Sequence, residues 1–316
     1  MPGSTENEVK PALEAASGKQ LGADFGLCYS PQFVALGSVI RDFLQAEFRL
    51  IGESDPVAGE ALAALYERVR EGDTPSIRTN FINAEIAKIA INTFVTTKIT
   101  FANMLARICE RSPGSDIDAI AGVLAHDGRI GRKCLKGATA YGGPCFPRDN
   151  LALSAYAESI GVSARLAEAT DRSNREEITL LADLVAAKLP AAGKVAVLGL
   201  AYKPDTDVVE ESPGFLLAGL LATRGIAVSA YDPQANQNAE RVLSKRVVFA
   251  ASASDCVAQA DVVVIATAWD EFRRMEPAQF SRNGSRCRVI IDCWRLFDAR
   301  RFDRSIEYVA LGRSQR

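Results

Sequence analysis

The segment from Tyr141 to Asp149 reads Tyr-Gly-Gly-Pro-Cys-Phe-Pro-Arg-Asp, which places the thiol of Cys145 beside a glycine-rich turn. Glycines let the backbone adopt conformations that other residues avoid and let it approach a ligand closely. A reactive thiolate requires positive surroundings, which Arg148 could supply. The segment therefore predicts a nucleophilic cysteine. The alternative is a buried structural cysteine next to an ordinary Gly-Gly turn.

A second candidate pair is Lys88 and Asn92, which are four residues apart in a segment with helical spacing. Residues at this spacing lie on one face of a helix. A lysine and an amide on adjacent turns could both donate hydrogen bonds to one developing oxyanion. The alternative is a solvated helix face, where such pairs are common.

The elements that position these residues change character along the chain. β-Branched segments alternate with helical ones in the last third of the sequence, at 195–199, 226–231, 261–267 and 289–292. This alternation predicts an α/β fold, with a Rossmann-like, doubly wound parallel sheet over residues 186–316. A ligand of such a sheet is expected at the carboxyl ends of its strands.

Residues 81–185 are predicted to be mostly helical. Apolar residues recur at helical spacing from 83 to 110, on more than one face, so this long helix should be buried against its own domain and against a partner. Further helices are expected at 147–161 and 164–189. Over residues 1–80 we expect strands at 25–29 and 48–51 and a helix at 56–70.

Composition excludes several classes of function. The 316 residues carry a net charge of −2 and 48% hydrophobic residues, so no global basic field favours nucleic acid. No apolar run approaches the roughly 20 residues that span a bilayer, and a cytoplasmic location is predicted. The seven cysteines lack Cys-x-x-Cys spacing, and the six besides Cys145 are interpreted as reduced thiols. With His126 as the only histidine, a Cys–His hydrolase or a histidine-rich metal site is disfavoured.

Three segments, in order, resemble motifs of the UDP-glucose/GDP-mannose dehydrogenase family. The Tyr141–Asp149 segment resembles its active-site motif, 85–92 its central helix, and 199–213, which reads Gly-Leu-Ala-Tyr-Lys-Pro-Asp and ends in Glu-Ser-Pro, its nucleotide-binding turn. The resemblance implies oxidation of the C6 alcohol of a nucleotide sugar to a carboxylate with two NAD⁺. It also implies a homodimer formed through the 83–110 helix.

The resemblance implies roles for particular residues. Cys145 would attack the C6 aldehyde, and the resulting thiohemiacetal would give its hydride to NAD⁺ and leave a thioester. Lys88 and Asn92 would steady the oxyanion, and Asp149 would assist proton transfer during hydrolysis. Covalent capture would explain why a four-electron oxidation need not release its aldehyde.

Other residues are assigned to binding. Those expected at the substrate are Arg129, Tyr141, Gly142, Gly143, Lys203 and Arg295, and those expected at NAD are Arg148 and Gln32. A solvated loop explains Arg129 as well as a contact to a neighbouring subunit's sugar site does. Asp232 could contact a ribose, although an Asp-Pro turn explains it equally well.

The sequence also departs from the family pattern. No Gly-x-Gly-x-x-Gly turn occurs, and Met1–Thr5 resembles a segment late in the NAD domain, so residues 1–80 are interpreted as the remnant of that domain. Gln32 and Leu36 replace two glutamates, and Val208 and Glu210 replace an acid and an arginine. Glu210 argues against UDP-glucose as the sugar. The alternative function is therefore a non-catalytic dimeric module that binds a nucleotide sugar.

Overall fold

The computed structural model describes residues 1–280, 287–302 and 304–314, and the chain forms two compact units. One unit comprises Met1–Thr93 and Asp149–Arg165, and the other comprises Phe94–Arg148 and Leu166–Arg316. The division into 1–80, 81–185 and 186–316 stays a prediction.

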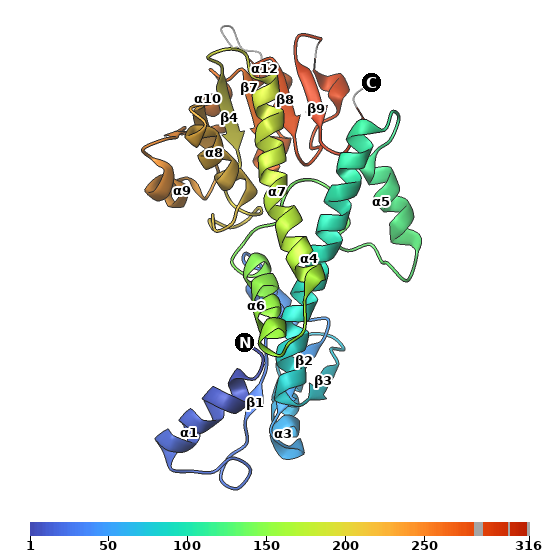
Figure 1. Cartoon of the computed structure of the whole chain (residues 1–316), viewed down its shortest axis with the longest axis vertical. Helices are drawn as coiled ribbons and strands as arrows, with labels where there is room; N and C mark the ends of the chain where they lie inside the picture. The colour runs from blue at the N-terminus through green and yellow to red at the C-terminus, as the bar shows by residue number, and fades with distance from the viewer. Residues whose placement is uncertain (281–286, 303, 315–316) are drawn as a thin grey trace. The chain divides into compact units, whose positions relative to one another are not determined.

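The second unit contains a six-stranded parallel sheet with the order β6-β5-β4-β7-β8-β9 (Figure 1). Its strands are β4 (Lys194–Leu198), β5 (Ala227–Tyr231), β6 (Val248–Phe249), β7 (Val262–Ile265), β8 (Val289–Asp292) and β9 (Glu307–Ala310). The chain builds outward from β4 to β6, returns to the other side of β4, and builds outward again. Since crossovers between parallel strands are right-handed as a rule, this order puts helices on both faces, in agreement with the predicted doubly wound class.

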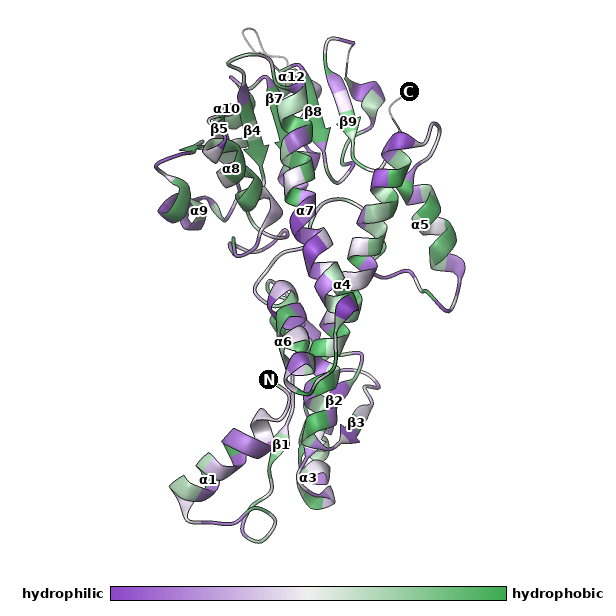
Figure 2. Ribbon diagram, viewed as in Figure 1, coloured by the Kyte–Doolittle hydropathy of each residue, from purple (hydrophilic) through white to green (hydrophobic). Residues whose placement is uncertain are grey.

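The core of this unit lies on the sheet. Strands β4, β7 and β8 are hydrophobic along their length (Figure 2), as expected for strands covered on both faces. Helices α7 (Arg165–Lys188), α8 (Pro213–Thr223) and α10 (Ala253–Val257) contribute Leu181, Leu217 and Val257 to the same core. The remaining helices of this part are α9 (Asn236–Leu243), α11 (Asp270–Arg273), α12 (Pro277–Phe280) and the 3₁₀ turn η2 (Ala299–Arg301).

Two further helices complete the second unit. Helix α4 spans 31 residues, Phe81–Arg111, in agreement with the long helix predicted at 83–110, and its part from Phe94 onward belongs to this unit. Helix α5 (Ile117–His126) begins with Asp116, whose side chain accepts a hydrogen bond from the backbone of Asp118. This capping satisfies a helix N–H group that would otherwise lack a partner.

The first unit contains a three-stranded sheet. Strand β1 (Cys28–Tyr29) pairs antiparallel with β2 (Arg49–Glu53), which pairs parallel with β3 (Ser76–Thr79). The helices of this unit are the π-helical turn η1 (Thr5–Val9), α1 (Lys10–Ser17), α2 (Val39–Leu44), α3 (Pro56–Glu67), the start of α4, and α6 (Phe146–Ser159) from Asp149 onward. Across the described residues, no helix has both the length and the apolar content needed to cross a membrane.

Candidate active site

The loop that carries Cys145 is held by one amide side chain. Asn174, on α7, accepts a hydrogen bond from the backbone N–H of Tyr141 at 2.8 Å and donates one to the Tyr141 carbonyl at 3.0 Å. Asn174 is buried, so both of its polar groups find partners on the loop backbone. Upstream, Asn103 of α4 binds the loop in the same way, through the backbone of Ala138 and Thr139. Two asparagines on two helices therefore fix the path of the chain towards Cys145.

Gly142 and Gly143 pack against the loop that follows β4. A Cβ atom on Gly142 would lie 2.1 Å from the carbonyl oxygen of Glu211, and one on Gly143 would lie 2.8 Å from the ring of Tyr202. Gly143 also has a φ of +87° and donates its backbone N–H to the Glu210 carbonyl at 2.9 Å. Both positions require glycine because the 199–212 loop approaches so closely. The structure therefore brings two of the three family-like segments into contact, the one that carries Cys145 and the one that follows β4.

Cys145 itself is the exposed thiol of the chain. All seven cysteines are free and described, and the other six are buried or partly buried. Burial raises the pKa of Cys256 and Cys287 to about 12, and the pKa of Cys293 is raised further by the same cause. These three thiols stay protonated near neutral pH, so they are poor nucleophiles. Cys145 directly precedes α6, and Arg148 lies exposed in the first turn of that helix.

In the first unit, Asn92 and Asp149 are in direct contact. The Asn92 Nδ2 group donates to Asp149 Oδ2 at 2.6 Å, and the Asp149 carboxyl is buried. The pKa of Tyr29 is raised by burial, and then by the charges of Glu85 and Asp149. Two of the four predicted catalytic residues thus meet, beside a second buried carboxylate.

Lys88 and Gln32 also meet, through the main chain of Gln32. The Lys88 ammonium donates to the Gln32 carbonyl oxygen at 2.9 Å and lies 4.5 Å from the centre of the Phe33 ring. The Gln32 amide points elsewhere and donates to the Ser30 carbonyl and to the Tyr66 hydroxyl. Gln32 thus has a structural role among these neighbours, and its assignment to the NAD site stays a prediction.

Sequence reasoning did not identify the role of Glu85. Its buried carboxylate accepts hydrogen bonds from the backbone N–H groups of Gly3 and Thr5 and from the Thr5 hydroxyl, at 2.5 to 2.8 Å. This contact attaches the N-terminal segment to α4, one turn before Lys88. The sequence signal that could have pointed to this role was the presence of a glutamate in the same helical segment as Lys88 and Asn92.

At the carboxyl end of β5, the Asp232 carboxylate accepts five N–H groups. These belong to the backbone of Leu200, Ala201, Gln234 and Ala235 and to the Trp269 ring, at 2.7 to 3.0 Å. A backbone N–H pair after the first strand is where a Rossmann fold usually binds phosphate. Here Asp232 occupies that pair, so the turn explanation accounts for this residue.

Lys203 and Arg129 are both accessible cations of the second unit. Lys203 is partly exposed on the loop after β4, with its ammonium 6.0 Å from the centre of the Tyr202 ring. Arg129 lies on the loop after α5, where it is largely exposed and paired with Asp127 at 2.6 Å. The substrate-binding roles of both residues stay predictions.

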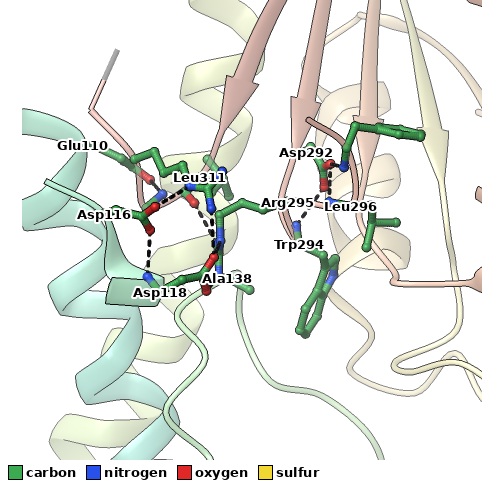
Figure 3. Close-up of polar contacts among 12 residues, drawn as sticks. Glu110, Asp116, Asp118, Ala138, Asp292, Trp294, Arg295, Leu296 and Leu311 are labelled. Carbon is green, nitrogen blue, oxygen red and sulfur yellow. Dashed lines mark hydrogen bonds and ion pairs between the residues drawn. The ribbon is translucent and has the colours of Figure 1, made fainter. Parts of the chain in front are cut away.

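Arg295 is enclosed by protein instead. It follows β8, has a left-handed φ of +56°, and binds both carboxylate oxygens of Asp118 and the carbonyl of Leu311 (Figure 3). Its side chain is only 1% exposed. Its assignment to substrate binding stays a prediction, whereas its contact with α5 is a feature of the fold that the sequence did not reveal. Within the described ranges, no cluster of acidic, cysteine and histidine side chains could hold a metal ion.

Comparison with known proteins covers most of the chain. Three models of the UDP-glucose/GDP-mannose dehydrogenase family match it: the NAD binding domain over 1–70, the central domain over 82–176 and the UDP binding domain over 196–299. The expectation that most of the NAD domain is missing is therefore wrong in part, because residues 1–70 match that domain.

Individual proteins give the same picture. The chain is 35% identical over 303 residues to the UDP-glucose 6-dehydrogenase AglM of Haloferax volcanii, covering 95% of the chain and 69% of that protein. It is 35% identical over 254 residues to TuaD of Bacillus subtilis, a UDP-glucose 6-dehydrogenase, covering 80% and 54%. A solved UDP-glucose dehydrogenase from Pyrobaculum islandicum superposes with a TM-score of 0.87 at 31% identity, covering 99% and 69%. The chain thus spans 54% to 69% of the length of these proteins.

Proposed function

Since the chain belongs to the UDP-glucose/GDP-mannose dehydrogenase family, we propose that it oxidises the C6 alcohol of a nucleotide sugar to the carboxylate. The observation that carries this proposal is the exposed Cys145 on a loop packed against the 199–212 loop of the UDP binding domain. That packing puts a nucleophile beside the part of the chain similar to a UDP binding domain. A UDP-hexose or UDP-N-acetylhexosamine is the proposed substrate class.

The thiol would act by covalent capture of the aldehyde. Addition of Cys145 Sγ to C6 forms a carbon–sulfur bond, and the carbonyl oxygen takes a proton. Departure of a hydride from C6, to an acceptor of the kind that NAD⁺ supplies, together with loss of the hydroxyl proton then leaves a thioester. Water replaces the sulfur, which gives the carboxylate and restores the thiol.

We assign the polar cluster of the first unit to the proton and water steps. Lys88 and Asn92 each carry N–H donors that can stabilise an oxyanion. The buried Asp149 carboxylate accepts a hydrogen bond from Asn92, which orients both groups, and a carboxylate of this kind is the group proposed to accept a proton from water. These roles are proposed from the family similarity together with this contact.

NAD⁺ is the hydride acceptor in this family, and the residues present account for only part of its site. The chain has no Gly-x-Gly-x-x-Gly turn. The N-terminal N–H groups of α3 are bonded to the Asp55 carboxylate, so that helix offers no phosphate cradle. A second candidate is a non-catalytic module that binds a nucleotide sugar.

The assembly and location proposed are a homodimer and the cytoplasm. Helix α4 exposes a stripe of Phe94, Phe101, Met104 and Ile108, each between 45% and 64% accessible. Residues spaced by three, four and seven positions share one helix face, which a second copy of the chain would cover.

The test is formation of NADH at 340 nm with NAD⁺ and a panel of UDP- and GDP-sugars, beside a Cys145→Ser control. Turnover that depends on Cys145 supports the dehydrogenase. Binding of a UDP-sugar by calorimetry without any turnover would support the binding module instead. Absence of both would contradict the two candidates together.

A further inference from the structure

Tyr202 packs against the cysteine loop, residues 141–145. The part of its ring nearest to Gly143 is the edge next to the hydroxyl group. A Cβ on Gly143 would be 2.8 Å from Cδ2 and Cε2 of Tyr202 and 3.2 Å from Cζ, the carbon that bears the hydroxyl. Gly143 precedes Cys145 by two residues. The glycine therefore lets the phenol and the thiol share one small region of the second unit.

Electrostatics place the two groups together as well. The pKa of Tyr202 is raised, first by burial and then by the charge of Cys145. Because a coulombic effect between two side chains falls off with distance, this coupling indicates that the phenol and the sulfur lie near each other. The electrostatics thus agree with the ring geometry.

The Tyr202 hydroxyl lacks a hydrogen-bond partner among the residues that the structure describes. Other half-buried tyrosines of the same unit have one: the Tyr231 hydroxyl donates to Glu271, and the Tyr308 hydroxyl to Asp292. The Tyr202 hydroxyl is not among the buried polar atoms that lack a partner, so it is accessible to a ligand. The backbone N–H of Tyr202 donates to the Val208 carbonyl at 3.0 Å.

We propose that Tyr202 is a substrate-contacting residue whose hydroxyl donates a hydrogen bond to a sugar oxygen near C6 of the nucleotide sugar. This inference rests on the proposed function, since Cys145 must attack C6 for the two groups to meet the same end of the ligand. The oxygens closest to C6 on a hexose are the ring oxygen and the C4 hydroxyl. Tyr202 would thus contact the sugar, while other residues would bind the UDP part of the ligand.

The test variant is Tyr202→Phe, which removes one oxygen and keeps the ring that packs on Gly143. We expect the Kd for a UDP-sugar, measured by calorimetry, to rise about twofold to tenfold, as for a lost neutral hydrogen bond. The Kd for UDP alone should not change, because UDP lacks the sugar. In the activity assay KM should rise by the same factor. Tyr231→Phe is the matched control and should bind both ligands like the unchanged chain.

Two results would overturn the inference while the proposed function stands. One is Cys145-dependent turnover with unchanged KM and Kd in Tyr202→Phe. The other is an equal loss of affinity for UDP and for the UDP-sugar, which would mean that the phenol acts through the loop. If the unchanged chain binds no nucleotide sugar, the inference and the proposed function both fail. A melting temperature close to that of the unchanged chain verifies that Tyr202→Phe is folded.

Discussion

Arg295 and Asp118 are 177 residues apart in the sequence and form a two-pronged ion pair, Nε to Oδ2 at 2.8 Å and Nη2 to Oδ1 at 2.9 Å. The third arm of the guanidinium donates to the Leu311 carbonyl at 2.7 Å, so one side chain joins the loop after β8, the first turn of α5 and the end of β9 (Figure 3). Arg313 adds contacts to Asp116 and Asp118. Planar bidentate pairing of this kind is specific to arginine.

Removal of this arginine should destabilise the second unit. Arg295→Met leaves the Leu311 carbonyl without its donor and Asp118 without its main partner, although the Asp118 side chain is 40% exposed and keeps Arg313. Loss of hydrogen bonds to a charged group of this kind costs about 2 kcal/mol. Urea denaturation measures the loss. Arg224→Met, which removes the exposed pair with Asp183, is the control and should cost under about 1 kcal/mol. Similar losses for both variants would contradict the structural role of Arg295.

Acid should weaken the same contact. Burial raises the pKa of Asp118, but the hydrogen bond and charge of Arg295, with smaller contributions from Lys136 and Arg313, outweigh it and place the pKa below the usual 3.8. A carboxyl whose pKa is lower in the folded state adds stability above the unfolded pKa and loses it as the pH falls. The unfolding free energy of the unchanged chain should therefore drop more steeply below about pH 4 than that of Asp118→Asn. Parallel pH curves would refute this.

Alanine at either glycine of the cysteine loop should be costly. In Gly142→Ala the new methyl group meets the Glu211 carbonyl, and in Gly143→Ala it meets the Tyr202 ring at a positive φ. Overpacking and backbone strain of this kind each cost about 1–3 kcal/mol. In Gly122→Ala, in α5, the new Cβ would have no atom within 4 Å. This change should leave the unfolding free energy unchanged or raise it by about 1 kcal/mol. Chemical denaturation of the three variants distinguishes these outcomes.

Alkylation should reach Cys145 before the other thiols. Brief treatment with iodoacetamide at neutral pH, followed by peptide mapping, is expected to modify Cys145 first because it is the exposed thiol. Cys256 and Cys287, with pKa values raised to about 12 by burial, should react only after unfolding in guanidinium. Cys145→Ser should remove the fast phase. Equal reaction of the buried thiols in the folded protein would disagree with the structure.

The apolar stripe on α4 predicts self-association. Phe101→Glu should lower the mass measured by sedimentation from that of a dimer to that of a monomer, because a charge buried at an apolar interface is strongly unfavourable. Val123→Glu, on α5, changes an apolar residue outside the stripe that is more exposed than Phe101, and it should leave the mass unchanged. A monomeric unchanged chain at micromolar concentration would refute the proposed homodimer.

The sequence predicted the long elements because their patterns are local. Helices α4, α6 and α7 and strands β4, β5, β7 and β8 lie within a few residues of the expected ranges. Strands β3, β6 and β9 were missed. Strand β6 has only two residues, and β3 and β9 mix polar with apolar residues, whereas β7 is entirely apolar and β8 is apolar up to its last residue. β9 is defined by its pairing with β8, which begins 18 residues earlier in the sequence. Such pairings depend on the sheet and not on local composition.

The candidate site shows the same limit. Motif similarity predicted that Cys145, Lys88, Asn92 and Asp149 are catalytic, which stays a prediction, and the structure joins the last two by a hydrogen bond. It could not identify Asn174 as the anchor of Tyr141, because the two are 33 residues apart and an asparagine within a helix has no distinctive pattern. Nor could it show that Arg295 is enclosed, since that depends on an acid in a distant helix.

The Asp232 carboxylate determines which ligands the turn after β4 can accept. With five N–H groups converging on its carboxylate, the unit carries a built-in counter-anion where related sheets would accept a dinucleotide's pyrophosphate. An incoming phosphate there would face like charge and donors that are already used. The loop after β4 therefore does not act as a cofactor-binding turn, and its hydrogen bonds to Asp232 hold it in place. It can then act as the fixed surface against which Gly142 and Gly143 pack, and this packing sets the path of the cysteine loop.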